Sequence, residues 1–219
     1  MLTIYGVYRS RASRNIWLAE ELGLPFKVVP VIQAYRLPNP AAPGAPLHTR
    51  SPDFLEVNPN GHVPTIDDDG LILHESLAIN LYLARKHGGP LAPRTIGEDG
   101  EMTMWALWAA TELEPQALTI LYHRIGGAPG GVKDPKIADA AVTALRPPFV
   151  VLDAALAKTG YLVGGRFTVA DLNMAEVARY ALAAPELFDA APNVKKWLAA
   201  CQARPAFKKM WAARDAEPA

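Results

Sequence analysis

The sequence predicts two parts of different fold class, an α/β domain followed by an all-α domain. Up to Lys86, short apolar and β-branched runs alternate with helical patterns. Beyond the glycine- and proline-rich segment that follows, every long stretch has helical periodicity. We therefore expect an α/β domain at residues 1–85, a linker at 86–98 and a helical domain at 99–219.

The chain begins with a strand–helix–strand pattern. LTIYGV predicts a first strand, and SRNIWLAEELG predicts a helix because Ile16, Ala19 and Leu22 recur at helical spacing. FKVVPVI predicts a second strand. A helical crossover between them would make the two strands parallel neighbours in one sheet.

A loop, a hairpin and a helix complete the first domain. Residues 37–52 are rich in proline, which predicts an irregular, exposed loop. VPTIDDDGLILHE predicts two strands joined by an Asp-Asp-Gly turn, and SLAINLYLARKHG predicts a helix. This order of strands and helices is the layout of a thioredoxin-like α/β domain.

The second part contains four long helical patterns and no strand pattern. TVAD has the form of a capping box, in which Thr168 and Asp171 close the first turn of a helix. We assign these two residues a structural role. The predicted helices span residues 101–125, 134–158, 169–183 and 194–213.

Charge and cysteine content exclude several classes of protein. Lys plus Arg and Asp plus Glu both number 22, so no net charge favours nucleic acid or an anionic membrane. The single cysteine, Cys201, excludes a disulfide framework and zinc sites built on cysteine pairs. The histidines lack metal-site spacing. We expect no metal site and no nucleic-acid partner.

The N-terminus and the apolar runs bear on the compartment. No basic segment followed by a long apolar run opens the chain, so we expect no signal peptide. No apolar stretch approaches the roughly 20 residues that cross a bilayer. We therefore expect a cytoplasmic protein that has no membrane partner.

The segment NGHVPTI and the pair Glu75–Ser76 form a candidate peptide site. Pro64 stands in a strand-like run although it has no N–H to give to a ladder. If the Val63–Pro64 bond is cis, the backbone groups of Val63 face an exposed edge where a short peptide can pair. Ser76 begins the next helix and can hold a carboxylate, and Glu75 can hold an ammonium. The pattern predicts a small peptide ligand with a free amino-acid end.

The segment RSRASR at the start of the first helix is a candidate anion site. Free N–H groups at a helix N-terminus favour anions. Ser10 and Ser13 add hydroxyl donors, and Arg9, Arg11 and Arg14 add positive charge. A thiolate would be stabilised there. Two other interpretations stay open: the arginines form a solvated face, and either serine is simply an N-cap.

These residues resemble the glutathione transferase family over nearly the whole chain. NGHVPTI followed by ESLAINLYL resembles the glutathione-site signature of the family, and FTVADLNMAEV resembles the capping-box helix of its C-terminal domain. The resemblance implies a thioredoxin-like domain that binds glutathione as co-substrate. It also implies a helical domain that supplies the pocket for a small hydrophobic electrophile, and a homodimer.

The resemblance further implies roles for single residues. Val63, beside a cis Pro64, would hydrogen-bond the cysteinyl backbone of glutathione. Glu75 and Ser76 would hold the γ-glutamyl end, and His62 would lie near the peptide. The glycyl carboxylate would meet the proline-rich loop.

The thiol activator has two interpretations under this resemblance. RSRASR resembles serine-type bacterial members and assigns the role to Ser10. YGVYRSR resembles the Tyr-x-x-x-Arg-x-Arg pattern of tyrosine-type members, which would make Tyr5 the donor and Arg11 its electrostatic helper. We expect Ser10 and Arg11 to be the catalytic residues. A cysteine-type enzyme is excluded because Cys201 lies near the far end of the chain.

The expected function is conjugation of the glutathione thiolate to a small apolar electrophile, in detoxification. One alternative is a glutathione-dependent peroxidase, disulfide reductase or isomerase. Another, of a different class, is a non-catalytic glutathione-binding or scaffold module. The pairs Val63–Pro64 and Glu75–Ser76 argue against a pure scaffold, which has no need of them.

Overall fold

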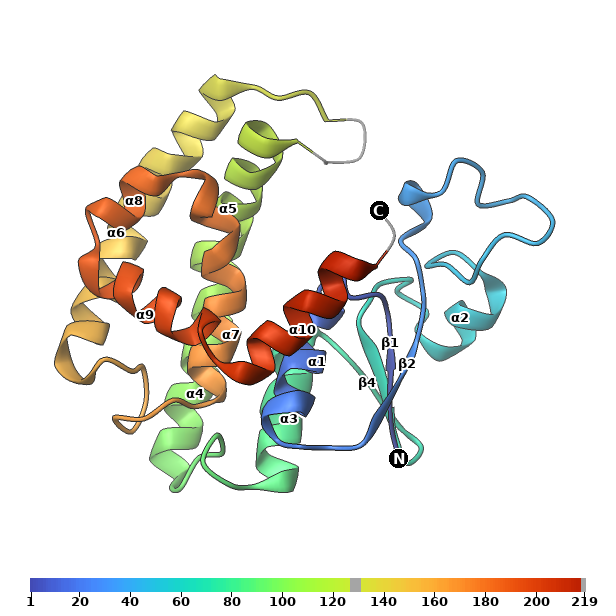
Figure 1. Cartoon of the computed structure of the whole chain (residues 1–219), viewed down its shortest axis with the longest axis horizontal. Helices are drawn as coiled ribbons and strands as arrows, with labels where there is room; N and C mark the ends of the chain where they lie inside the picture. The colour runs from blue at the N-terminus through green and yellow to red at the C-terminus, as the bar shows by residue number, and fades with distance from the viewer. Residues whose placement is uncertain (127–130, 218–219) are drawn as a thin grey trace. The chain divides into compact units, whose positions relative to one another are not determined.

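The structure is a computed structural model that describes residues 1–126 and 131–217, and it forms two compact units (Figure 1). The first unit comprises Met1–Leu83 and the C-terminal segment from Pro205. The second unit comprises Ala84–Arg204. The domain borders at residues 85 and 99 stay predictions from the sequence. Each compact unit is described by itself.

The first unit contains a four-stranded sheet built from β1 (Leu2–Tyr5), β2 (Phe26–Val29), β3 (Thr65–Asp68) and β4 (Leu71–His74). The strand order is β2-β1-β3-β4. β1 pairs parallel with β2 and antiparallel with β3, and β3 pairs antiparallel with β4. This sheet confirms the predicted thioredoxin-like layout.

The turn between β3 and β4 is the predicted Asp-Asp-Gly turn. Asp69 and Gly70 have φ angles of 54° and 93°, and two successive positive values are typical of a tight hairpin turn. The Gly70 N–H donates to Asp67 Oδ1 at 2.7 Å, which closes the turn.

Four α-helices accompany this sheet in the first unit, with the last turn of α3 beyond the unit's border: α1 (Ala12–Glu21), α2 (Pro52–Val57), α3 (Ser76–His87) and α10 (Pro205–Ala216). α1 is buried along almost its whole length. Its Trp17 packs edge-on against Phe207 of α10, with ring centroids 4.9 Å apart. Figure 1 shows α10 running beside α1, so residues from the two ends of the chain build one core.

The proline-rich segment is irregular between the short 3-10 helix η1 (Ala34–Arg36) and α2, as predicted. His48 braces it from a buried position. The Arg50 N–H donates to His48 Nδ1 at 3.1 Å, so Nε2 carries the ring hydrogen and donates it to Pro40 O at 2.8 Å.

Among the residues that the structure describes, every element of the second unit longer than an isolated β-bridge is a helix. Two predicted helix borders are wrong. The helix expected at 101–125 begins earlier, at Ile96, because Thr95 caps it by accepting the Glu98 N–H at 3.1 Å. The helix expected at 194–213 is two helices, because Pro205 cannot continue a helix and instead begins a new one. The elements are α4 (Ile96–Trp108), η2 (Ala109–Leu113), α5 (Glu114–Ile120), η3 (Leu121–Ile125), α6 (Pro135–Thr159), α7 (Val169–Ala178), η4 (Arg179–Ala183), α8 (Pro185–Asp189) and α9 (Pro192–Gln202).

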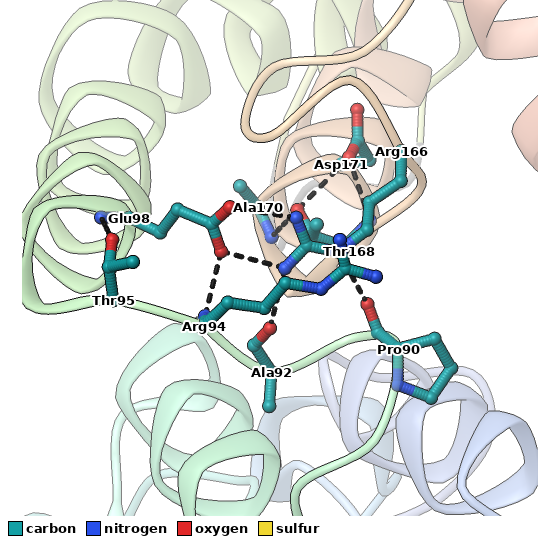
Figure 2. Close-up of polar contacts among 9 residues, drawn as sticks. All are labelled: Pro90, Ala92, Arg94, Thr95, Glu98, Arg166, Thr168, Ala170 and Asp171. Carbon is teal, nitrogen blue, oxygen red and sulfur yellow. Dashed lines mark hydrogen bonds and ion pairs between the residues drawn. The ribbon is translucent and has the colours of Figure 1, made fainter.

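The predicted capping box at the start of α7 is present, and Figure 2 shows it beside an ion pair. The Thr168 N–H donates to Asp171 Oδ2 at 2.9 Å. Leu162 N and Trp197 Nε1 each donate to Asp171 Oδ1 at 3.0 Å. Burial raises the pKa of Asp171, and these donors oppose that rise. The residue is therefore a structural hub, in agreement with the role assigned from sequence.

The ion pair of Figure 2 ties the start of α4 to the loop before α7. Arg166 donates to both carboxylate oxygens of Glu98, at 2.8 and 2.7 Å, and to the carbonyls of Pro90 and Ala92. The Arg94 N–H donates to Glu98 Oε2 at 2.7 Å. The bonds from Arg166 and Arg94 lower the pKa of Glu98 from 4.5 to about 2.

Helix α6 is long and apolar enough to cross a membrane by length and composition alone. The expectation that no apolar stretch approaches this length is therefore wrong, since charged residues interrupt the run without removing its apolar character. Within its unit α6 behaves as a core helix. Its Phe149 packs edge-on against Phe188 at 5.1 Å, and its Asp153 accepts the N–H groups of Asn193 and Val194.

Candidate functional site

The Val63–Pro64 peptide bond is cis, as predicted. Neither backbone polar group of Val63 has a hydrogen-bond partner within the described residues. Asn58 holds the loop that contains Val63 and Pro64. Its Nδ2 donates to His62 O and to Thr65 Oγ1, both at 2.9 Å. Asn58 is fully buried. Val63 is thus held in a braced loop with its N–H and C=O available to a ligand.

Glu75 and Ser76 lie at the start of α3. Glu75 is exposed and has φ 72°, a left-handed conformation that is uncommon for residues other than glycine and typical of functional positions. Its carboxylate has no partner within the described residues. Ser76 is buried, and its Oγ accepts a hydrogen bond from Arg14 NH1 at 3.0 Å. The Ser76 hydroxyl keeps its own hydrogen for a ligand.

A buried polar cluster joins α1 to the start of α3. Asn15 Nδ2 donates to Ser76 O at 2.9 Å and to Asn80 Oδ1 at 2.6 Å. Asn80 Nδ2 in turn donates to Arg14 O at 3.3 Å. These bonds fix Ser76 relative to α1. They also hold the backbone of Arg14, whose guanidinium contacts the Ser76 hydroxyl.

Ser10 lies in the turn between β1 and α1 and is buried. Its Oγ donates to Val7 O at 2.7 Å and accepts the Ala12 N–H at 3.1 Å. Ser10 therefore satisfies one of the N–H groups at the start of α1. Ser13, the other candidate cap, lies inside the helix.

Gly6 brings Ser10 and the peptide loop together. Its φ is 149°, and a Cβ there would meet Ala12 Cβ at 2.7 Å. The same point lies 3.4 Å from Ser10 Oγ and 3.6 Å from Val63 Cβ. The Ser10 hydroxyl and Val63 Cβ therefore both lie within ordinary contact distance of the point that a Gly6 side chain would occupy, and the approach of Ala12 leaves no room for a side chain there.

Comparison with known proteins agrees with this geometry. The family models named "Glutathione S-transferase, N-terminal domain" and "Glutathione S-transferase, C-terminal domain" match residues 9–86 and 112–205. Glutathione S-transferase 3 of Zea mays is 33% identical, over 99% of this chain and 96% of the relative. GstB of Escherichia coli K12 is 30% identical, over 96% and 97%. The chain belongs to the glutathione S-transferase family.

Solved transferases share the fold over the full length. Glutathione S-transferase I from maize, in complex with an atrazine glutathione conjugate, has a TM-score of 0.83 and 30% identity. That match covers 99% of each chain. The present protein is therefore a glutathione transferase, an enzyme whose co-substrate is glutathione, with a thioredoxin-like N-terminal domain and a helical C-terminal domain.

The other predicted residues of this transferase have different surroundings from Ser10 and Val63. Tyr5 packs beside Phe54 of α2, with ring centroids 6.3 Å apart. Arg11 is exposed at the N-cap of α1. His62 is also exposed, and its carbonyl is tied to Asn58.

Sequence reasoning missed three residues that shape the glutathione transferase site. It counted Arg14 among the basic residues but not as the partner of Ser76, and it passed over Gly6 and Asn58. The polar pair Arg14–Asn15, directly before the apolar residues Ile16 and Trp17, was the signal that could have pointed to a buried polar contact.

Proposed function

We propose that this glutathione transferase conjugates the glutathione thiolate to small apolar electrophiles, with Ser10 as the thiol activator. The observation that carries the proposal is that Ser10 Oγ and Val63 Cβ lie 3.4 and 3.6 Å from the same point beside Gly6, the point that a Cβ on this glycine would occupy. A peptide bound to the backbone of Val63 through its cysteine would have its thiol near the Ser10 hydroxyl. The maize structure with a bound atrazine glutathione conjugate supports conjugation as the reaction.

The rest of glutathione is assigned to the start of α3. Ser76 donates its hydroxyl hydrogen to the γ-glutamyl carboxylate, and the buried Arg14 behind it adds positive charge. Glu75, exposed and with no partner in the described residues, holds the ammonium. His62 directly precedes Val63 and is exposed, so its side chain can contact the peptide.

The proposed activation is a matter of charge. Lowering the pKa of a thiol from about 8.5 by about 2 units requires about 2.7 kcal/mol of preferential binding of the anion. A hydroxyl donor to a charged acceptor supplies about 1.5–3 kcal/mol, and the helix N-terminus supplies up to about 1. Turning the Ser10 hydroxyl away from Val7 O costs about 1 kcal/mol. The net contribution is about 0.5–3 kcal/mol, which reaches the required value of about 2.7 kcal/mol at its upper end without a buried base.

The thiolate then attacks the electrophilic carbon. A carbon–sulfur bond forms, and either a leaving group departs with its electron pair or the adduct takes a proton from water. In this proposal, residues 1–85 bind glutathione, and the helical domain at 99–219 supplies the electrophile pocket. We propose that Arg11 adds positive potential near the thiolate, and that the enzyme acts as a cytoplasmic homodimer in detoxification.

Retention on immobilised glutathione followed by a substrate panel tests the function. We expect retention, activity with 1-chloro-2,4-dinitrobenzene, and loss of that activity in Ser10→Ala. Turnover of cumene hydroperoxide or of hydroxyethyl disulfide without conjugation would instead show a reductase. Retention with no turnover of any substrate would show a binding module.

A further inference from the structure

The two residues before Ser10 lie in a turn that is held by a distant carboxylate. Tyr8 and Arg9 belong to neither β1 nor α1. Glu217, which directly follows α10, accepts the Tyr8 N–H on Oε1 at 2.9 Å and the Arg9 N–H on Oε2 at 2.7 Å. One side chain from the end of the chain thus satisfies two successive N–H groups beside the proposed activator.

The carbonyl groups of the same turn are held by arginines. Arg214 NH1 donates to Tyr8 O at 2.8 Å, and Arg36 NH1 donates to Arg9 O at 3.5 Å. Arg9 Nε returns a bond to Arg214 O at 3.1 Å. All four backbone polar groups of Tyr8 and Arg9 are therefore bound by charged side chains. Hydrogen bonds with a charged partner are roughly twice as strong as neutral ones.

The turn determines where the Ser10 hydroxyl lies. Ser10 N and Ser10 Oγ both donate to Val7 O, at 3.0 and 2.7 Å, across the loop that contains Tyr8 and Arg9. The backbone bond from Ser10 N to Val7 O remains when the hydroxyl turns to a thiolate, so a change in this loop moves the Ser10 backbone and with it the position from which the hydroxyl donates. We infer that Glu217 is a positioning residue for Ser10, fixing the turn from which the hydroxyl reaches the glutathione thiolate. This inference rests on the proposed role of Ser10.

Glu217 has two effects on a bound thiol, and they have opposite signs. As a nearby negative charge it disfavours the thiolate, so its removal by that effect alone lowers the pKa of the thiol. As a positioning residue it aligns the donor to the thiolate, so its removal raises that pKa. The sign of the shift separates positioning from a general charge effect.

α10 also offers a matched control for loss of a charged contact. Lys209 Nζ pairs with Glu20 Oε2 at 2.6 Å, and within the described residues it makes no hydrogen bond to the Tyr8–Arg9 backbone. Lys209→Gln removes this tie between α10 and α1 and leaves the turn intact. A role of Glu217 that is merely structural should resemble this control.

The experiment compares wild type with Glu217→Ala, Glu217→Gln, Glu217→Asp and Lys209→Gln. The readouts are kcat and KM with 1-chloro-2,4-dinitrobenzene, thiolate absorbance against pH with glutathione bound, and amide hydrogen exchange at residues 8–10. We expect Glu217→Ala to lower kcat about 10-fold or more and to raise the thiol pKa, because misplaced catalytic groups cost rate steeply. Glu217→Gln should be intermediate, since its amide oxygen can serve only one N–H well, and Glu217→Asp should restore part of the loss.

The opposite results overturn the inference. A lowered thiol pKa or a wild-type kcat in Glu217→Ala does so, as do equal changes in Lys209→Gln. If wild type itself shows no thiolate with bound glutathione, the proposed activation has failed at that step. Amide exchange then still decides the point, because wild-type rates at residues 8–10 in Glu217→Ala show that Glu217 does not order the turn.

Discussion

Arg14 NH1 donates a hydrogen bond to the hydroxyl of Ser76 at 3.0 Å, and both residues are buried in the first unit. A buried guanidinium needs acceptors, and a ligand carboxylate beyond Ser76 would be one more partner for its charge. The contact therefore joins a structural requirement of α1 to the proposed binding of glutathione. This contact distinguishes the buried Arg14 from Arg11, whose side chain is exposed.

We predict that Arg14→Met raises KM for glutathione by about 10-fold, the equivalent of a weakened charged hydrogen bond, with a smaller effect on kcat. Arg11→Met is the matched control and should leave KM near the wild-type value. Ser76→Ala should be non-additive with Arg14→Met, because the two residues act through one contact. The measurement is steady-state kinetics, with melting temperatures to confirm folding. A KM increase in Arg11→Met alone would contradict this assignment.

Local pattern predicted the sheet but not which arginine of α1 is buried. The alternation of strands and helix, the Asp-Asp-Gly turn and the Thr168–Asp171 capping box depend on neighbouring residues, so they could be recognised in sequence. The buried Arg14 contacts Ser76 at the start of α3, a residue far from it in the sequence. Local pattern cannot show this contact, and the contact of Glu217 with Tyr8 is equally non-local.

Gly6→Ala should damage both stability and activity. The new Cβ would lie 2.7 Å from Ala12 Cβ. The alanine would also have to adopt a φ of 149°. We expect a loss of roughly 1–3 kcal/mol in the free energy of unfolding, and a lower kcat because relief of the clash with Ala12 shifts the start of α1 beside Ser10. Denaturant unfolding and steady-state kinetics measure the two effects.

Gly23→Ala provides the control for the Gly6 prediction. Gly23 has φ 64°, and a Cβ there would meet nothing within 4 Å. Its substitution should cost stability through backbone strain while kcat stays at the wild-type value. Equal losses of kcat in the two variants would show that Gly6 has no special relation to the site.

The Glu98–Arg166 pair predicts how the stability of the helical unit depends on pH. The pKa of Glu98 is lowered from 4.5 to about 2 by its hydrogen bonds to Arg166 and Arg94. A carboxyl group whose pKa is lowered by folding contributes stability above its unfolded pKa, and that contribution disappears as pH falls through the folded pKa. The free-energy difference between wild type and Glu98→Gln should therefore shrink from pH 4.5 to pH 2. Denaturant unfolding at several pH values measures it, with exposed Glu101→Gln as the control, and a difference that does not change over this range would refute the prediction.

The choice between Ser10 and Tyr5 can be decided by the ionisation of bound glutathione. Ser10 Oγ and Val63 Cβ both lie beside Gly6, whereas the Tyr5 ring packs against Phe54. We predict that Ser10→Ala raises the pKa of the bound thiol by about one unit or more, the equivalent of a lost charged hydrogen bond of about 1.5–3 kcal/mol. It should also lower stability by about 1 kcal/mol, because the Ala12 N–H loses its acceptor. Tyr5→Phe should leave the thiol pKa unchanged. Thiolate absorbance against pH, measured with glutathione bound to wild type and both variants, gives the answer.

A shift of the thiol pKa in Tyr5→Phe without one in Ser10→Ala would make this a tyrosine-type enzyme. No shift in either variant would mean that the backbone N–H groups and the arginines alone stabilise the thiolate.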